Sequence, residues 1–201
     1  MGKVKAVLFD ADGVLTVPEE LFSNKYAQSK GLDTEPFKQF FRGPFQQALI
    51  GKAALKDLIQ QYNDVWQWDG EVEDLLRQWC ESEDLRNVPL IEYAQSLRKS
   101  GTPCYVGTNQ ERYRGNYMQE VMFKDLFDGF FISSEMGVMK PDIAYFEKAI
   151  DGIKAINAHV SAPQEILFFD DTPSHVEGAK RAGLQAYLFT DIEQVKELTG
   201  Q

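Results

Sequence analysis

Two pairs of aspartates, each directly after a short apolar segment, are the residues best placed to do chemistry in this sequence. The pairs are Asp10 with Asp12 and Asp170 with Asp171. If both segments are strands of a parallel sheet, the four carboxylates meet at the edge where such sheets bind ligands. Like charges about 4 Å apart repel by about 1 kcal/mol in water and about 4 kcal/mol at an effective dielectric constant near 20. This oxygen-only cluster therefore predicts a hard cation, and Mg²⁺ fits best.

Residues able to bind an anion stand at two other positions next to predicted helices. Thr108 ends an apolar run and opens the next predicted helix, so its hydroxyl and the backbone N–H groups from Asn109 onward form a natural anion site. Lys140 stands just before Pro141 and another predicted helix. An ammonium there neutralises the acidic cluster and binds a phosphate oxygen as a point charge.

Each of these residues also has a plainer explanation. An Asp before Gly13 is common turn chemistry, and Thr108 or Asp171 can simply cap a helix. A single lysine such as Lys140 is usually a solvated surface charge. What favours a functional interpretation is the set, because every group lies at the end of a predicted strand or just before a helix.

The elements that position these groups alternate along the chain. Apolar runs predict strands, and side chains at helical spacing, as in Ile91, Ala94 and Leu97, separate most of them. Such alternation predicts an α/β fold with a Rossmann-like parallel sheet covered on both faces. The predicted strands occupy residues 3–10, 103–107, 130–132, 165–169 and 185–189.

Residues 17–88 follow a different pattern, with no convincing strand. Two stripes at helical spacing begin at Leu55 and Val72. We expect a small all-helical module inserted after the first strand, with residues 1–16 and 89–201 forming the core. An aromatic cluster in this region is expected to pack inside the module rather than contact substrate: Phe37, Phe40, Phe41 and Phe45.

Composition narrows the function classes. The 201 residues carry a net charge of −10 with no basic run, which disfavours nucleic acid as a partner. No apolar run approaches the roughly 20 residues that span a bilayer, and none suits a signal peptide. We expect a cytoplasmic protein without a membrane partner, in which Cys80 and Cys104 are reduced thiols. The oligomeric state is not readable from the sequence.

The ordered set of groups resembles the haloacid dehalogenase (HAD) superfamily over essentially the whole chain. Residues 9–14, Phe-Asp-Ala-Asp-Gly-Val, match its first motif, and Thr108 and Lys140 stand for the second and third. Asp170 and Asp171 stand for the fourth, within residues 168–183. The position of the insert resembles that of the helical cap in members acting on small phosphometabolites. His175 departs from the Asn or Asp of many relatives.

The resemblance implies a role for each matching residue. Asp10 would attack phosphorus to form an aspartyl-phosphate, and Asp12 would protonate the leaving oxygen and then activate water. Thr108, Asn109 and Lys140 would hold the phosphoryl group. The resemblance further implies that Mg²⁺ is bound by Asp10, the Asp12 carbonyl and Asp171, with Asp170 as a direct or indirect helper.

These roles imply a phosphatase for a small phosphorylated metabolite, such as a sugar phosphate or a nucleotide. Haloacid dehalogenases lack an acid at the position of Asp12, which favours phosphoryl transfer. Two alternatives stay open: a sugar-phosphate mutase of the same design, and a catalytically silent binding protein. The candidates for specificity, each more simply a solvated residue, are Arg42, Gln46, Gln47 and Lys52.

Overall fold

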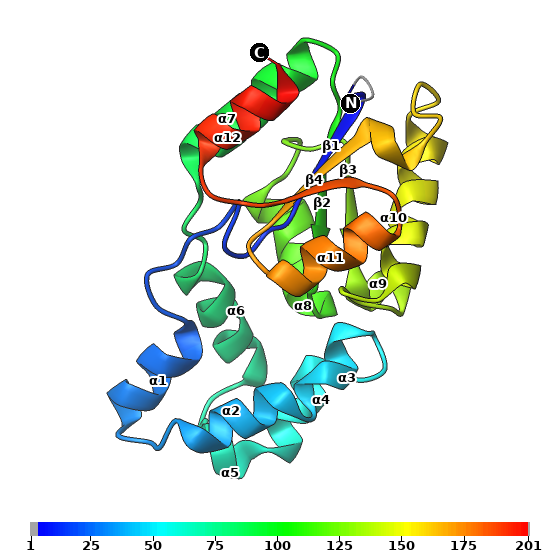
Figure 1. The fold of residues 1–201 in the computed structure, drawn as a ribbon. Coiled ribbons are helices and arrows are strands. Elements are labelled where there is room, and N and C mark those ends of the chain that lie inside the picture. The colour runs from blue at the N-terminus through cyan, green and yellow to red at the C-terminus, as the bar shows by residue number, and fades with distance from the viewer. Residues whose placement is uncertain (1–3, 201) are drawn as a thin grey trace.

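The computed structural model describes residues 4–200; the ends of the predicted core at 1–3 and 201 lie outside the described residues. Its centre is a five-stranded parallel sheet in the order β3-β2-β1-β4-β5, which confirms the predicted fold class (Figure 1). The strands are β1 (Ala6–Phe9), β2 (Cys104–Thr108), β3 (Gly129–Ile132), β4 (Ile166–Asp170) and β5 (Gln185–Leu188).

The strand order brings the first and fourth motifs side by side. From β1 the chain builds β2 and β3 on one side and then crosses to β4 on the other. Phe9 pairs with Phe169, and Asp10 N donates to Phe169 O at 2.8 Å. The two strands therefore end together at the switch point of the sheet, the place where open α/β sheets bind ligands.

Helices cover both faces of the sheet. Leu90 and Leu97 of α7 and Val195 of α12 pack on one face, and Phe146 of α10 and Val176 of α11 pack on the other. No described helix has the length and apolar character needed to cross a bilayer. The elements of this part are α7 (Val88–Lys99), α8 (Arg112–Tyr117), η1 (Met118–Met122), α9 (Ser133–Met136), α10 (Ile143–Ile156), η2 (Pro163–Glu165), α11 (Pro173–Arg181) and α12 (Ile192–Thr199).

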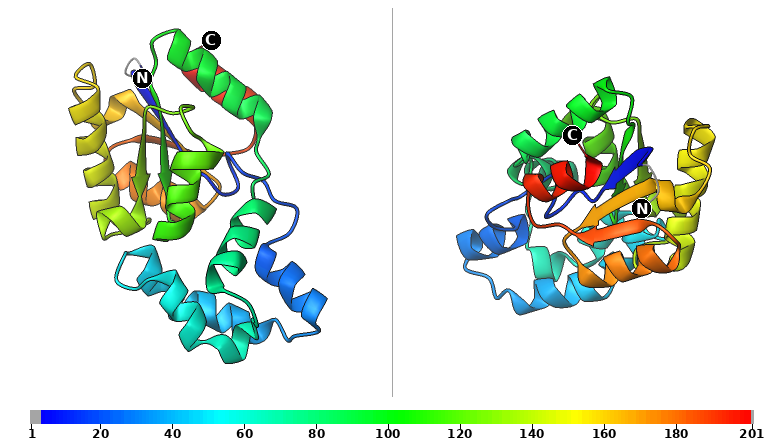
Figure 2. Two further views of the ribbon diagram at one scale, coloured as in Figure 1. Left: turned by 180° about the vertical axis from the view of Figure 1, so that it is seen from behind. Right: turned by 45° about the horizontal axis from the view of Figure 1, so that its top comes forward.

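Six helices between β1 and α7 form a helical module with its own core, at the carboxyl edge of the sheet (Figures 1 and 2). That core is largely aromatic: Trp66 is fully buried, and its ring centroid lies 5.0 Å from that of Phe37 and 5.5 Å from that of Phe40. The helices are α1 (Phe22–Lys30), α2 (Glu35–Arg42), α3 (Phe45–Leu49), α4 (Leu55–Gln61), α5 (Asn63–Trp66) and α6 (Val72–Ser82).

Hydrogen bonds that involve the main chain join the helical module to the core on two sides. At the two segments where the chain leaves the core for the module and returns to it, Val17 N donates to Leu85 O and Asn87 N donates to Leu15 O, both at 2.8 Å. On the far side of the module, the Ser133 hydroxyl of α9 donates to Leu49 O at 2.6 Å. The module therefore stands over the sheet edge, supported on both sides of it.

The aromatic core of the helical module generates a stability prediction. We expect Trp66→Ala to lower the free energy of unfolding by about 3–5 kcal/mol, because it empties a fully buried ring site. The matched variant Trp68→Ala, at a half-buried position, should cost about 1 kcal/mol. Urea unfolding followed by circular dichroism measures both. Equal losses in the two variants would contradict this account of the core.

Candidate active site

Lys140 occupies the centre of the acidic cluster and is fully buried. Its Nζ lies 2.8 Å from Asp10 Oδ1 and 2.6 Å from Asp170 Oδ2, and it donates to Gly107 O at 3.0 Å. All three N–H groups of the ammonium therefore have acceptors, from the ends of β1, β4 and β2. The lysine is a structural counter-ion for the carboxylates as well as a predicted phosphate ligand.

The pKa values of this cluster follow from burial and from the ion pairs. Burial raises the pKa of Asp10 well above its ordinary value; Asp170 adds to the rise, and Lys140 opposes it. Burial by itself lowers the pKa of Lys140, but the two carboxylates outweigh it and the net shift is upward. Lys140 therefore stays charged, whereas burial disfavours the carboxylate form of Asp10 and positive charge nearby favours it.

Asp170 is enclosed by its partners. Thr172 N donates to its Oδ1 at 2.8 Å, His175 Nδ1 lies 3.1 Å from the same oxygen, and Lys140 holds the other. Burial alone would raise the pKa of Asp170, but the bonds from His175 and Lys140 outweigh it and lower it. Both oxygens are committed within the protein, so Asp170 is better suited to hold Lys140 and His175 than to bind a metal directly.

Asp12 faces the cleft and is held by three donors. Thr16 Oγ1 donates to its Oδ1 at 2.9 Å, Arg114 Nη2 lies 2.7 Å from the same atom, and Gln110 Nε2 donates to its Oδ2. The side chain is still 48% exposed, in contrast to that of Asp10 at 9%. Asp12 is thus fixed in orientation while remaining accessible, as an acid/base group must be.

Arg114 connects Asp12 to the helical module. Its Nη1 is paired with Glu83 Oε2, and Glu83 Oε1 accepts from Phe22 N at 2.7 Å and from Trp79 Nε1 at 3.0 Å. Glu83 follows the last helix of the module, and Phe22 starts its first. A continuous set of polar contacts, buried from Arg114 onward, therefore runs from Asp12 into the module.

Asp171 and Asn109 complete the predicted set in different ways. Asp171 is exposed, and its Oδ2 lies close to Gly13, only 2.0 Å from where a Cβ on that residue would stand. The carboxamide of Asn109 donates to Lys140 O and accepts from Lys140 N, each at 2.9 Å. Asn109 therefore positions the lysine backbone through its side chain, and Thr108 lies buried beside it.

These residues share one cleft of about 560 Å³. Its floor comes from strand ends and its wall includes Leu21 and Glu83 of the helical module. Among the predicted site residues, Asp170 alone does not line it. Those that do are Asp10, Asp12, Thr108, Asn109, Lys140 and Asp171, together with His175.

Residues 4–183 match the family model of haloacid dehalogenase-like hydrolases. The chain belongs to the haloacid dehalogenase-like hydrolase family. The match spans strands β1 to β4, the residues that line the cleft and the helical module. The resemblance inferred from the motifs is confirmed.

Relatives of this HAD-like hydrolase match more than nine-tenths of the chain. It is 27% identical to a sesquiterpene phosphatase of Aspergillus oryzae, over 93% of this chain and 90% of that protein. It is 24% identical to bifunctional epoxide hydrolase 2 of Sus scrofa over 98% of its own length, but it spans 39% of that protein. Among solved structures, a HAD family enzyme of Bacteroides thetaiotaomicron in complex with magnesium and inorganic phosphate has a TM-score of 0.76 at 19% identity, covering 96% and 98% of the two chains.

Sequence reasoning missed four polar residues at or behind Asp12 in this HAD-like hydrolase: Thr16, Gln110, Arg114 and Glu83. Gln110 directly follows the second motif and Arg114 lies in the helix after it, so an extension of that motif was the available signal. The sequence carries no signal for Glu83, because this residue only follows an amphipathic helix. The aromatic cluster also divides: Phe40 is buried in the module, while Phe41 is half-buried and lines a cavity.

The Arg114–Glu83 pair generates a second prediction. We expect Arg114→Met to lower the free energy of unfolding by about 3–5 kcal/mol, because Glu83 is left buried without a counter-ion. The double variant Glu83→Gln/Arg114→Met should regain much of that loss, since the neutral amide oxygen still accepts from Phe22 and Trp79. Urea unfolding of the wild type, the two single variants and the double variant gives a double-mutant cycle. If the losses in unfolding free energy of the single variants add up to that of the double variant, the coupling is refuted.

Proposed function

We propose that this HAD-like hydrolase is a Mg²⁺-dependent phosphate-monoester hydrolase that uses Asp10 as its nucleophile. The observation that carries the proposal is the geometry at the cleft floor. There Asp10 is buried beside Lys140 at 2.8 Å, and Asp12, two residues on, faces the same space. A carboxylate attacks a phosphate only where the charge of the phosphate is masked, and a cation with a fixed lysine supplies that masking.

The reaction needs two displacements at phosphorus. In the first, a carboxylate oxygen of Asp10 bonds to phosphorus as the ester P–O bond breaks, and Asp12 gives its proton to the leaving alcohol oxygen. In the second, water attacks the aspartyl-phosphate, Asp12 takes the water proton, and phosphate leaves with the Asp10 carboxylate restored. The bonds from Thr16, Gln110 and Arg114 keep Asp12 oriented for the second step.

The donor set of the cleft fits Mg²⁺. We propose that the ion is held by the Asp10 carboxylate, the Asp12 main-chain carbonyl and the Asp171 carboxylate, all oxygen donors. When bound, the ion would polarise the phosphoryl oxygens and add positive charge that favours the carboxylate form of Asp10 against the effect of burial. Support comes from Gly13, whose missing side chain leaves the space that the Asp171 carboxylate occupies.

We propose that residues 17–88 act as the cap of this site and that residues 1–16 and 89–201 carry the chemistry. The cleft has walls from both parts, so closure of the cap would exclude water during formation of the aspartyl-phosphate. Support for phosphate removal also comes from the relatives: one is named a phosphatase, and another is named as a complex with magnesium and phosphate. The substrate class proposed on this basis is a small phosphorylated metabolite.

The nucleophile is tested with p-nitrophenyl phosphate. We expect Mg²⁺-dependent release of nitrophenol that stops with EDTA and falls at least about a thousandfold in Asp10→Asn, because the amide cannot form the acyl phosphate. The matched variant Asp151→Asn, at an exposed position on α10, should keep the wild-type rate. Absence of release over a broad panel of phosphate esters, with and without metal, would sink the proposal.

The metal site is tested at Gly13. We expect Gly13→Ala to weaken Mg²⁺ binding about tenfold or more, because the new Cβ displaces the Asp171 carboxylate. Gly137→Ala is a matched control, since Gly137 has a similar positive φ but open space around it. The Mg²⁺ concentration dependence of the rate and of the melting temperature measures both. If both variants behave alike, backbone strain rather than displacement of Asp171 is responsible.

A further inference from the structure

A second cavity adjoins the catalytic cleft and lies between the core and the helical module. It has a volume of about 190 Å³ and shares Asp12, Leu21, Glu83 and Asn109 with the cleft. A phosphate ester whose phosphorus lies at Asp10 has its leaving oxygen near Asp12. The organic group beyond that oxygen therefore points toward this second cavity.

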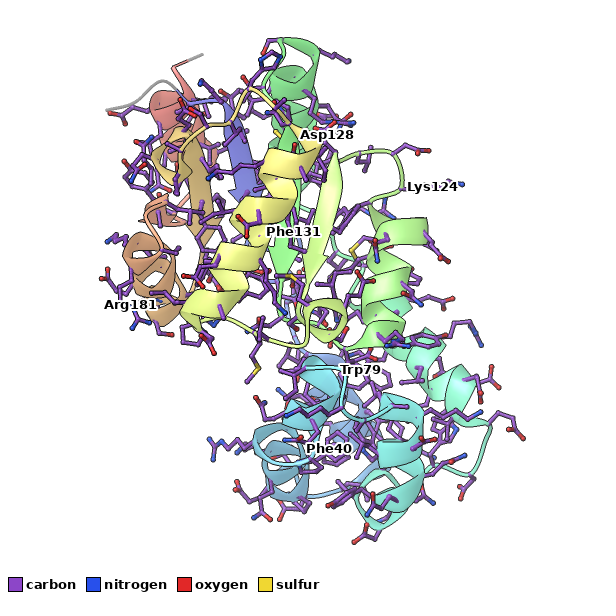
Figure 3. All side chains as sticks on the ribbon, turned by 90° about the vertical axis from the view of Figure 1, so that its right-hand side faces the viewer. Phe40, Trp79, Lys124, Asp128, Phe131 and Arg181 are labelled. Atoms are coloured by element: carbon purple, nitrogen blue, oxygen red, sulfur yellow. The ribbon has the colours of Figure 1, made fainter. Side chains whose placement is uncertain are left out.

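The wall of this cavity is mainly aromatic and aliphatic. The side chains of Phe41, Phe45, Leu49, Leu55, Leu76 and Trp79 line it. Trp79 is the central wall residue: its ring centroid lies 5.6 Å from that of Phe41 and 6.1 Å from that of Phe45. Figure 3 shows Trp79 on the side of the module that faces the core, nearer to it than Phe40. These rings present a packed apolar surface to whatever enters.

The charged groups at this cavity are already used within the protein. Arg114 is the only basic side chain among the described residues that line it, and its two terminal nitrogens contact Asp12 and Glu83. Glu111 accepts from the backbone N–H groups of Tyr113 and Arg114. Among these charged groups only Arg114 Nε is left without a partner, so they offer a single free donor to the several hydroxyls of a sugar.

The balance of charge also disfavours a second anionic group. Three carboxylates line the cavity, Asp12, Glu83 and Glu111, against the one guanidinium of Arg114. A second phosphate or a carboxylate on the ligand would be repelled and would find no free cation here among the described residues. The candidates suggested by the sequence for specificity, Arg42 and Lys52, do not line this cavity.

We propose that this cavity binds the organic part of the substrate and that this part is an apolar hydrocarbon group. The substrate class is then a monophosphate ester of an aliphatic alcohol rather than a sugar phosphate, a nucleotide or a diphosphate. The inference rests on the proposed phosphatase function, which it narrows. Each methylene group buried against this wall should improve binding about fourfold, until the cavity is full.

The first experiment measures kcat/KM for ethyl, butyl, hexyl and octyl phosphate with Mg²⁺, beside a hexose phosphate and hexyl diphosphate. We expect a rise of about fourfold per methylene over the shorter members. The kcat/KM for hexyl phosphate should exceed that for the hexose phosphate and that for hexyl diphosphate by at least about tenfold, because the cavity wall is apolar and its charged groups are mainly acidic. A flat series, or a preference for the hexose phosphate, overturns the inference while leaving the phosphatase proposal standing.

The second experiment changes the wall at Phe45, which is half-buried and therefore costs the fold less to replace than the buried Trp79. Phe45→Gln should reduce the preference for hexyl over ethyl phosphate about tenfold or more, while Phe45→Leu should retain most of it. Val121→Gln, at a residue 55% exposed on η1, is the control that should leave the preference unchanged. Equal preferences in all four proteins would overturn the inference.

A binding measurement separates the two proposals. Alkylphosphonates of the same chain lengths, which lack the scissile ester bond, are titrated into the wild-type protein with Mg²⁺ by calorimetry. Affinity that rises with chain length supports the apolar cavity even if no ester is hydrolysed, in which case the phosphatase proposal alone fails. Affinity independent of chain length overturns the inference whatever the turnover.

Discussion

The ammonium of Lys140 lies between two buried carboxylates that would otherwise repel each other. Its contacts with Asp10, Asp170 and Gly107 O come from the ends of three adjacent strands, β1, β4 and β2. Burying ions costs several kcal/mol each, and only good geometry with additional hydrogen bonds offsets that cost. Here Asn109 fixes the backbone of the lysine, and His175 and Thr172 N satisfy the remaining oxygen of Asp170. The carboxyl edge of the sheet depends on this cation.

A second buried ion group joins the chemistry to the helical module. Arg114 bridges Asp12 on the core and Glu83 at the end of α6, and the other oxygen of Glu83 receives Phe22 N at the start of α1. The start of α1 and the end of α6, the first and last helices of the module, thus meet at the Glu83 carboxylate. Any movement of the module that displaces Glu83 changes the contacts of Arg114, the residue that holds Asp12. The orientation of Asp12 and the position of the helical module are therefore linked through Arg114.

The catalytic cleft and the apolar cavity meet at Asp12 and Glu83, but their walls have different origins. Strand ends supply the charged floor, while the aromatic core of the module extends to the cavity at Trp79 and Phe45. The same rings therefore stabilise the module and shape the space for the organic group. A change of substrate preference through these rings carries a cost in stability, whereas a change in the charged floor alters the chemistry.

The sequence by itself determined the sheet, the inserted helices and the charged residues at strand ends. Those features are local, since apolar periodicity and a short motif after a strand report on neighbours along the chain. Tertiary structure alone decided which polar groups surround Asp12, because Arg114 and Gln110 lie about a hundred residues away and Glu83 contacts Arg114 across a further gap. It also decided that Asp170 is enclosed and that Phe45 faces a cavity. Convergence of side chains from distant elements leaves no periodic signal, so only the packed chain reveals it.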